Sequence, residues 1–208
     1  VKPGNLLVRD RERLGFRLVI VDFGLALAGE DEAAEAYRAR GGYQTLEKAL
    51  KMAPADVTKE VTASGLLGHG GAAFPVGRKW GVMKPIPGEI HYLCANADEG
   101  EPGTFKDRWI LEHNPHMLIE GMLITAYALQ VRNAFVYIRG EFDLPFRRLQ
   151  GAVDEAYAAG LLGEGILGVD FSCDLVVYRG AGSYVCGEAS GLLSSLEGKR
   201  GYPRNRPP

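Results

Sequence analysis

The sequence predicts an α/β protein in which a parallel sheet is flanked by helices. Three strand-like runs alternate with three helix-like runs over residues 90–196, and parallel strands need long crossover connections of this kind. The 208 residues are 46% hydrophobic and 24% charged, which is ordinary for a globular domain and excludes disordered and fibrous classes. Glycine, with 28 residues, is about twice as frequent as usual, and its clustering indicates loops that approach a ligand closely.

The first part of the chain is expected to contain only short elements. Residues 6–8 and 18–23 have the composition of two β runs joined by a charged loop. Residues 30–40 are rich in alanine and glutamate and favour a helix, and two further short helices are expected over 45–52 and 56–64.

The alternating part begins after a glycine-rich loop. The loop covers 65–77, and the expected elements are 90–95 (strand), 114–131 (helix), 134–138 (strand), 143–159 (helix), 175–178 (strand) and 187–196 (helix). Asn114 and Pro115 have the residue types of an N-cap and a first helical position. Because ligands of such sheets bind beyond the carboxyl ends of the strands, segments 96–103 and 180–188 are predicted to border a site.

Charge and cysteine content exclude several classes of function. Twenty-four Lys and Arg against 26 Asp and Glu give a net charge of -2, which provides no overall attraction for nucleic acid or an anionic membrane. Charges interrupt every apolar run before it reaches the ~20 residues that a membrane span needs. Three scattered cysteines and four histidines without zinc spacing argue against a disulfide framework or a metal site and favour a reducing compartment.

The first candidate segment is GHGGAAFPVGRKW, residues 68–80. Closely spaced glycines allow several backbone N–H groups to converge on an anion or on the edge of a flavin. Lys79 adds a positive charge, and Phe74 offers a flat face for stacking on an aromatic base. The alternative is a tight loop in which Phe74 and Trp80 are core anchors, and the spacing alone favours neither interpretation.

The second candidate segment is NADEGEPG, residues 96–103, which follows an expected strand. Its carboxylates, Asp98, Glu99 and Glu101, repel one another unless donors lie between them. Ribityl or sugar hydroxyls and ring N–H groups are suitable donors, and a hard cation is another possible partner. The alternative is a solvated acidic turn, but the place at the end of a strand favours a ligand site.

The third candidate segment is GAGSYVCGE, residues 180–188, which follows a strand and opens a helix. This is the context of a nucleotide-binding glycine turn, although both the Walker loop and the GxGxxG spacing are lacking. Cys186 has no histidine near it in sequence and is predicted to be a small buried residue and not a nucleophile. His113 and His116 are expected at the surface before a helix.

Taken in this order, the three motifs closely resemble the flavoprotein subunit of NADH:quinone oxidoreductase (respiratory complex I) and the diaphorase subunits of NAD-linked hydrogenases and formate dehydrogenases. The resemblance runs from about residue 34 to residue 208 and includes GGYQTLEKAL and SLEGKRGYPRNRPP. It implies an FMN site at which NADH delivers a hydride directly to the flavin, so that no side chain acts as a catalytic residue. It also implies iron–sulfur partner subunits, no nucleic-acid partner, no direct membrane insertion and a cytoplasmic location in which partner subunits hold the chain at the membrane face.

The resemblance also implies binding roles at the matching positions. Contacts with FMN are implied for Gly68, Gly70, Gly71, Lys79, Asn96, Asp98, Glu99, Tyr184, Gly187 and Glu188. Phe74 is expected to stack on the nucleotide base of NADH, and Glu101 is expected near the nicotinamide. No metal site is expected in the residues present.

The sequence departs from the family pattern at several positions. His69, Ala73 and Val76 stand where the family usually has Arg, Gly and Thr, and Ala-Ser-Gly at 189–191 replaces Glu-Thr-Ala. An alanine at position 73 is expected to keep the loop out of the positive-φ region. Loss of the second carboxylate would weaken contacts with NADH or flavin, so a divergent non-catalytic remnant that serves as a binding or structural domain is a second hypothesis.

Two expectations concern the domain organisation. In the family, an Asn-rich stretch, a ubiquitin-like domain and a helical domain with the cysteine ligands of a [4Fe-4S] cluster follow the Pro-Pro. Residues 27–208 are therefore expected to be an FMN/NADH-binding domain truncated at its C-terminus. Residues 1–26 instead resemble a Ser/Thr protein kinase from catalytic loop to DFG motif, with Asn5 and Asp22 as magnesium ligands. Such a stub cannot bury its own core, so kinase activity is not expected, and a β-hairpin extension is the alternative.

Overall fold

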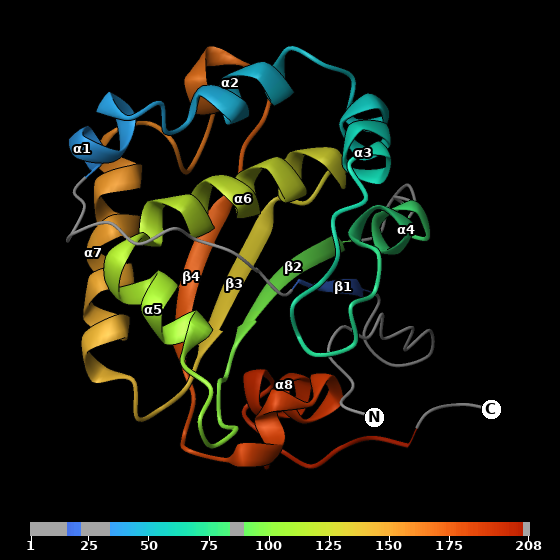
Figure 1. The fold of residues 1–208 in the computed structure, drawn as a ribbon, viewed down its shortest axis with the longest axis vertical. Coiled ribbons are helices and arrows are strands. Elements are labelled where there is room, and N and C mark those ends of the chain that lie inside the picture. Colours follow the sequence, from blue (N-terminus) through green and yellow to red (C-terminus); the bar gives the residue numbers. More distant parts are fainter. Residues whose placement is uncertain (1–15, 22–33, 84–89, 206–208) are drawn as a thin grey trace.

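The computed structural model describes residues 16–21, 34–83 and 90–205. Within these ranges, four parallel strands form one sheet in the order β1-β2-β3-β4, with helices packed around it (Figure 1). The strands are β1 (Phe16–Val21), β2 (Ile90–Ala97), β3 (Asn133–Ile138) and β4 (Asp174–Arg179). The predicted α/β class with a parallel sheet and flanking helices is confirmed.

The helices of the described residues are mostly short. They are α1 (Ala34–Ala39), α2 (Gln44–Leu50), α3 (Pro54–Ala63), α4 (Val76–Gly81), α5 (Lys106–His113), α6 (Pro115–Ala128), α7 (Asp143–Ala158) and α8 (Ala189–Leu196), with 3-10 turns η1 (Ile166–Gly168) and η2 (Tyr184–Gly187). The sequence pattern predicts six of these helices to within a few residues but misses α4 and α5. The helix predicted over 187–196 begins two residues before α8, and the 3-10 turn η2 within the glycine-rich segment is not predicted.

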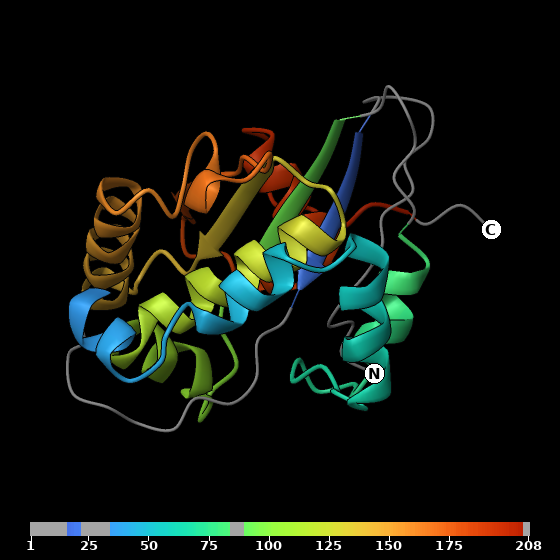
Figure 2. The same ribbon diagram turned by 90° about the horizontal axis from the view of Figure 1, so that it is seen from above.

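The two faces of the sheet are covered by different helices (Figure 2). Side chains alternate along β2 and β3, so Leu93 and Val136 point into the main core while Cys94 and Tyr137 point into a second core. Helix α6 packs on the first face, and its apolar residues are buried on nearly all sides. Helix α8 packs on the second face through Leu192. This second core also contains Cys186, which is 2% exposed, as its sequence context predicts.

The register of the sheet brings the carboxyl ends of three strands to one edge. Asn96 of β2 is opposite Tyr137 of β3, which is opposite Tyr178 of β4. The segments that follow β2 and β4 therefore leave the sheet at the same end, with β3 between the two strands, as the parallel topology requires. Two of the three candidate segments are the ones that emerge there.

One histidine prediction is wrong. His116 is fully buried: its Nδ1 lies 2.8 Å from the hydroxyl of Tyr43, and its Nε2 lies 3.3 Å from Oε2 of Glu155. The reason is that the first turn of α6 lies against the segment between α1 and α2, which the sequence pattern does not place. His113 is half-buried and stacks on Trp109 with ring centroids 4.0 Å apart.

The strand predicted over 18–23 is present as β1, which pairs in parallel with β2 at the edge of the sheet. The other β run predicted over 6–8 and the kinase-like positions Asn5 and Asp22 lie outside the described residues. Among the described helices, none combines the length and the apolar character that crossing a membrane requires.

Candidate functional site

A pocket of about 360 Å³ lies at the carboxyl-end edge of the sheet, a volume typical of sites for small molecules and cofactors. Segments 69–71, 96–107 and 184–188 contribute its lining. The three candidate segments, far apart in sequence, are thus brought to one cavity. The lining includes the predicted residues Gly70, Gly71, Asn96, Asp98, Glu99, Glu101, Tyr184, Gly187 and Glu188. Their individual roles in cofactor binding stay predictions.

Gly68, Phe74 and Lys79 are described but are not among the lining residues. The N–H of Gly68 donates to the carbonyl of Phe74 at 2.8 Å, so this amide closes the loop instead of facing the cavity. Phe74 is 41% exposed, with the guanidinium of Arg78 6.0 Å from its ring centroid. Trp80 is buried in the main core. The core-anchor interpretation therefore holds for Trp80 and not for Phe74.

Lys79 is 4% exposed on α4, a helix that packs tightly on α3. A Cβ at Gly77 would lie 2.4 Å from the Cα of Thr62, so the two helices can approach this closely only with glycine there. The position of Lys79 is thus set by helix packing, and its predicted contact with FMN stays a prediction.

The backbone of the first loop corrects the expectation for Ala73. Its φ is +48°, and Gly71 nearby has a φ of +97°. The loop has to turn back so that Leu67 can bridge Pro75 in antiparallel fashion, and this closure imposes a left-handed residue at position 73. An L-residue with a side chain pays roughly 1 kcal/mol for that conformation.

The acidic segment is not a solvated turn, since Asp98 and Glu99 are 9% and 6% exposed. Glu99 accepts hydrogen bonds from the backbone N–H groups of Asp107 at 3.0 Å and of Arg108 at 3.1 Å. It therefore caps the N-terminus of α5, where a carboxylate is favoured. Helix α5 has no capping side chain at its own N-cap, Phe105, which is why the local sequence does not indicate where it begins.

The remaining carboxylates of this segment have different environments. Glu101 accepts a hydrogen bond from the hydroxyl of Tyr184, a contact that joins the second and third segments across the pocket. Tyr184 is 64% exposed, and its ring would lie 3.1 Å from a Cβ at Gly100. The protein thus supplies donors to Glu99 and Glu101, which relieves the repulsion that the sequence predicts.

Asp98 is the exception among the three carboxylates. Burial raises its pKa to about 6, although Arg139 lowers it and Glu141 raises it further. Its Oδ2 is buried and has no hydrogen-bond partner within the described part of the chain. A buried carboxyl oxygen without a donor is costly, so a ligand hydroxyl or ring N–H in the pocket would fit this position.

The loops after β2 and β4 are tied to each other. Asn96 donates through Nδ2 to the carbonyl of Gly187 at 3.0 Å, and its Oδ1 accepts from the N–H of Asp98 at 3.1 Å. A Cβ at Gly187 would lie 3.3 Å from the carbonyl oxygen of Asp98, which is tighter than an ordinary contact. Gly187 therefore allows the two loops to approach each other at the base of the pocket.

Glu188 is the N-cap of α8. Its Oε2 accepts from the N–H groups of Ser190 and Gly191, each at 2.9 Å, and from the Ser190 hydroxyl at 2.6 Å. This carboxylate is held rigidly while it lines the pocket. Two of the pocket carboxylates, Glu99 and Glu188, thus cap helices that begin at the cavity.

Sequence reasoning assigns no binding role to the other lining residues. These are His69, Gly100, Thr104, Lys106, Asp107 and Val185. Lys106 forms an ion pair with Asp107 at 2.6 Å, in the first turn of α5. If the sequence had indicated a helix beginning at Lys106, both residues would have been expected at the pocket, because that helix begins shortly after the acidic segment 96–103. No group of three or more His, Cys, Asp or Glu within the described ranges is arranged to hold a metal ion.

Comparison with known proteins identifies the family. Residues 61–208 match the Nuo51 FMN-binding domain. The NADH-quinone oxidoreductase F subunit of Streptomyces coelicolor is 54% identical over 181 residues, covering 86% of this chain and 40% of the relative. The corresponding protein of Aquifex aeolicus is 51% identical over 172 residues, covering 83% of this chain and 40% of the relative.

A solved structure shares the fold. The crystal structure of an NAD+-reducing [NiFe]-hydrogenase in the air-oxidized state matches with a TM-score of 0.69 and 33% identity, covering 88% of this chain and 31% of that chain. The chain spans about two fifths of the length of the curated relatives named above. Since the family match covers well over half of the chain and agrees with the three motifs, the chain belongs to the Nuo51 FMN-binding domain family.

Proposed function

We propose that the chain is an FMN-binding electron-input module that accepts hydride from NADH and passes electrons toward the iron–sulfur clusters of a larger complex. The observation that supports this most strongly is the convergence of three separate family motifs on one pocket. When bound, FMN supplies the hydride-accepting ring, and the protein supplies binding, orientation and electrostatics.

The residues of the pocket suit a flavin nucleotide. The Oδ2 of Asp98, which has no hydrogen-bond partner among the described residues, is an acceptor for a ribityl hydroxyl or a ring N–H. Gly70 and Gly71 bring backbone to the cavity without side chains, and the capped carboxylate of Glu188 is a fixed part of its wall. These groups would bind and orient FMN before NADH arrives.

The nicotinamide substrate would approach from the open side of the same pocket. Glu101 lies there with its hydrogen bond from Tyr184, a residue that is itself largely exposed. Phe74 keeps a partly exposed ring outside the lining, where it is available for stacking on the base of a dinucleotide. This arrangement would exclude water from the flavin while NADH is bound.

Partner subunits would receive the electrons, because the chain covers only part of its relatives and those relatives are subunits by name. We place the [4Fe-4S] cluster of such an assembly in residues beyond those present. A cytoplasmic location, with partner subunits holding the chain at the membrane face, is part of this proposal. The three cysteines, which are free and buried, are compatible with a reducing compartment.

The test is direct titration of the purified chain with FMN. Flavin fluorescence should be quenched on binding, and NADH added anaerobically should bleach the flavin absorption near ~450 nm. Asp98→Ala should weaken FMN binding, while Asp56→Ala, on the exposed surface of α3, serves as the matched control. A colourless chain that takes up no FMN would instead support the second hypothesis, a non-catalytic remnant of the module.

A further inference from the structure

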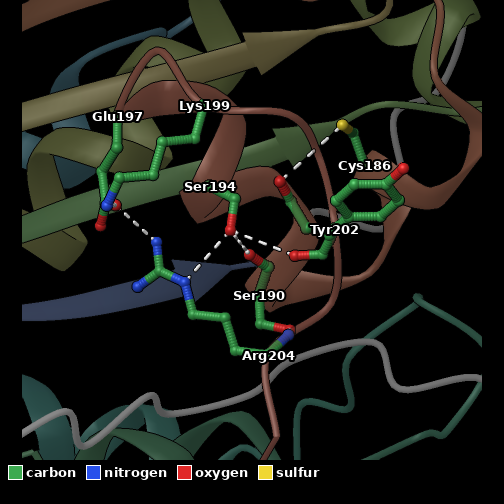
Figure 3. Close-up of polar contacts among 8 residues, drawn as sticks. Cys186, Ser190, Ser194, Glu197, Lys199, Tyr202 and Arg204 are labelled. Carbon is green, nitrogen blue, oxygen red and sulfur yellow. Dashed lines mark hydrogen bonds and ion pairs between the residues drawn. The ribbon is translucent and has the colours of Figure 1, made fainter.

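The segment that follows α8 returns to the first turn of that helix (Figure 3). We call residues 201–205 the strap. The backbone N–H of Arg204 donates to Oγ of Ser190 at 2.9 Å, and the Ser190 hydroxyl donates to Oε2 of Glu188 at 2.6 Å. A single hydroxyl therefore connects the strap to a carboxylate that lines the pocket.

The side chain of Arg204 fixes the strap along the length of α8 (Figure 3). Its Nε donates to Oγ of Ser194 at 3.1 Å, and its Nη2 lies 2.7 Å from Oε2 of Glu197, the C-cap of the helix. Burial alone would raise the pKa of Glu197, but hydrogen bonds from Arg204 and Lys199 lower it overall. The Ser194 hydroxyl also donates to the carbonyl of Tyr202 at 3.1 Å, which fixes a second point of the strap.

Two glycines let the strap lie close to η2 and α8. A Cβ at Gly201 would lie 2.5 Å from Sγ of Cys186, and one at Gly191 of α8 would lie 2.7 Å from the carbonyl oxygen of Val185 and 3.4 Å from that of Gly201 in the strap. Cys186 and Val185 belong to η2, the turn that carries pocket residues. A shift of the strap would therefore be transmitted to the wall of the pocket.

We propose that Arg204 is a positioning residue of the flavin site, which holds the strap on α8 and, through Ser190, fixes the Glu188 carboxylate. Arg204 is not among the lining residues, so its effect on a ligand is indirect. The nature of the ligand rests on the proposed function, whereas the hydrogen-bond route from Arg204 to Glu188 does not.

The first measurement is the dissociation constant for FMN, by fluorescence quenching, in the purified chain. Arg204→Ala should raise this dissociation constant about tenfold, since the Glu188 carboxylate at the pocket loses its fixed position. The affinity of Arg204→Lys should lie between that of Arg204→Ala and that of wild type. The lysine ammonium can pair with Glu197, but it does not reproduce the planar guanidinium that also donates to Ser194. Ser190→Ala should match Arg204→Ala, and Ser190→Thr, which keeps the hydroxyl, should behave as wild type.

A matched control separates positioning from stability. The ammonium of Lys199 pairs with the same Oε2 of Glu197 at 2.7 Å, but within the described ranges it donates no hydrogen bond to the hydroxyl of Ser190 or Ser194. Lys199→Ala should therefore leave the FMN dissociation constant within about twofold of wild type. If Lys199→Ala and Arg204→Ala weaken FMN binding equally, Arg204 has only a structural role and the proposal is overturned.

The second measurement needs no flavin. Amide hydrogen exchange at Ser190 and Gly191, the two N–H groups that Glu188 caps, should accelerate in Arg204→Ala and not in Lys199→Ala. In the double variant Arg204→Ala/Ser190→Ala, the two effects on affinity should not add, because both act along one route. Additive effects, or unchanged exchange at both amides, would overturn the positioning role. Failure of the wild-type chain to bind FMN would overturn the proposed function alone, and the exchange result would still decide the role of Arg204.

Discussion

Two buried carboxylates of this protein have opposite surroundings. Glu120 on α6 is 7% exposed and accepts hydrogen bonds from the Tyr37 hydroxyl and from the N–H groups of Tyr43 and Leu46, both at 3.0 Å. Asp98 at the end of β2 is similarly buried, yet its Oδ2 has no partner within the described part of the chain. Glu120 is thus a structural group that fixes α2 on α6, whereas Asp98 keeps an oxygen without a partner at the pocket.

The comparison explains how one chain can be stable and still keep a buried carboxylate with an unsatisfied oxygen at a pocket. On the α6 side, the protein itself supplies three donors to Glu120, and this carboxylate caps α2 from a distant helix. On the pocket side, Glu99 and Glu188 cap helices but Asp98 does not. Of the buried polar atoms in the described part of the chain that have no hydrogen-bond partner, the Asp98 oxygen is the one whose residue lines the pocket.

The largest effect on stability is expected from Glu120→Ala. It leaves a tyrosine hydroxyl and two backbone N–H groups buried without their acceptor, so the free energy of unfolding should fall by about 3 kcal/mol. Urea denaturation followed by circular dichroism measures this, with the exposed Glu60→Ala as control. FMN affinity per folded molecule should not change; if it does, the two carboxylate sites are not independent.

The next largest effect is expected from Gly71→Val. Gly71 has a φ of +97° and lines the pocket, so a branched side chain strains the loop and fills space meant for a ligand. Flavin retention should fall by about 100-fold or more, measured as bound FMN after gel filtration. Gly65→Val is the matched control, because Gly65 also has a positive φ, +67°, but has open space around it. Full flavin retention in Gly71→Val would show that the first loop does not contact the cofactor.

Asp98→Asn sharpens the comparison through its pH dependence. The folded-state pKa of Asp98, about 6, lies above the ordinary value of 3.8, so the native state holds a proton that the unfolded state loses between these values. The destabilisation caused by Asp98 therefore develops as the pH rises from about 4 to about 6 and is complete above pH 6. Asp98→Asn should raise the free energy of unfolding by about 1 kcal/mol at pH 7.5 and not at pH 4. Denaturation at both pH values measures this, and an equal change at both would exclude the titration of Asp98 as the cause.

Glu101→Gln tests the open side of the pocket. The amide can still accept from Tyr184, so flavin content should remain near that of wild type. Loss of the negative charge should slow reduction by NADH by about tenfold in stopped-flow absorbance measurements. The exposed Glu47→Gln is the control, and an unchanged reduction rate in Glu101→Gln would remove Glu101 from the nicotinamide region.

The smallest effect is expected from Ala73→Gly. Glycine relieves the strain at a φ of +48°, although it also increases the entropy of the unfolded chain. The net stabilisation should be about 0.5 kcal/mol, a rise of roughly 1–2 °C in Tm by differential scanning calorimetry. A lower Tm would mean that the loop does not need a left-handed residue there.

Much of the fold could be predicted because its signals are local. The alternating strands and helices from β2 to α8 have clear apolar patterns and turn residues, and the positions of the second and third segments at strand ends follow from parallel topology. Helix α5 could not be predicted in this way, because its cap is Glu99, several residues away and outside the helix. The burial of His116 likewise depends on Tyr43 and Glu155, which no local pattern connects to it.

The candidate site was predictable as a set of segments but not as a set of contacts. The motifs identify which loops meet, and most of their predicted residues line the pocket. They do not show that the Gly68 amide closes its own loop, or that Lys79 is buried on α4 outside the lining. These outcomes depend on how the loop folds back and on how α3 and α4 pack, which involve contacts between residues distant in sequence.

The amino-acid sequence alone determined the class of the fold, the family and the segments that form the pocket, because periodicity and motif spacing are properties of neighbouring residues. Only the tertiary structure decided which buried carboxylate is satisfied and which keeps an oxygen without a partner among the described residues, and which residues outside the pocket are hydrogen-bonded to its wall. The physical reason is that a hydrogen bond depends on distance and direction in space. Glu120 finds its donors on α2, and Glu188 is reached from Arg204 through Ser190, across separations that no local pattern encodes.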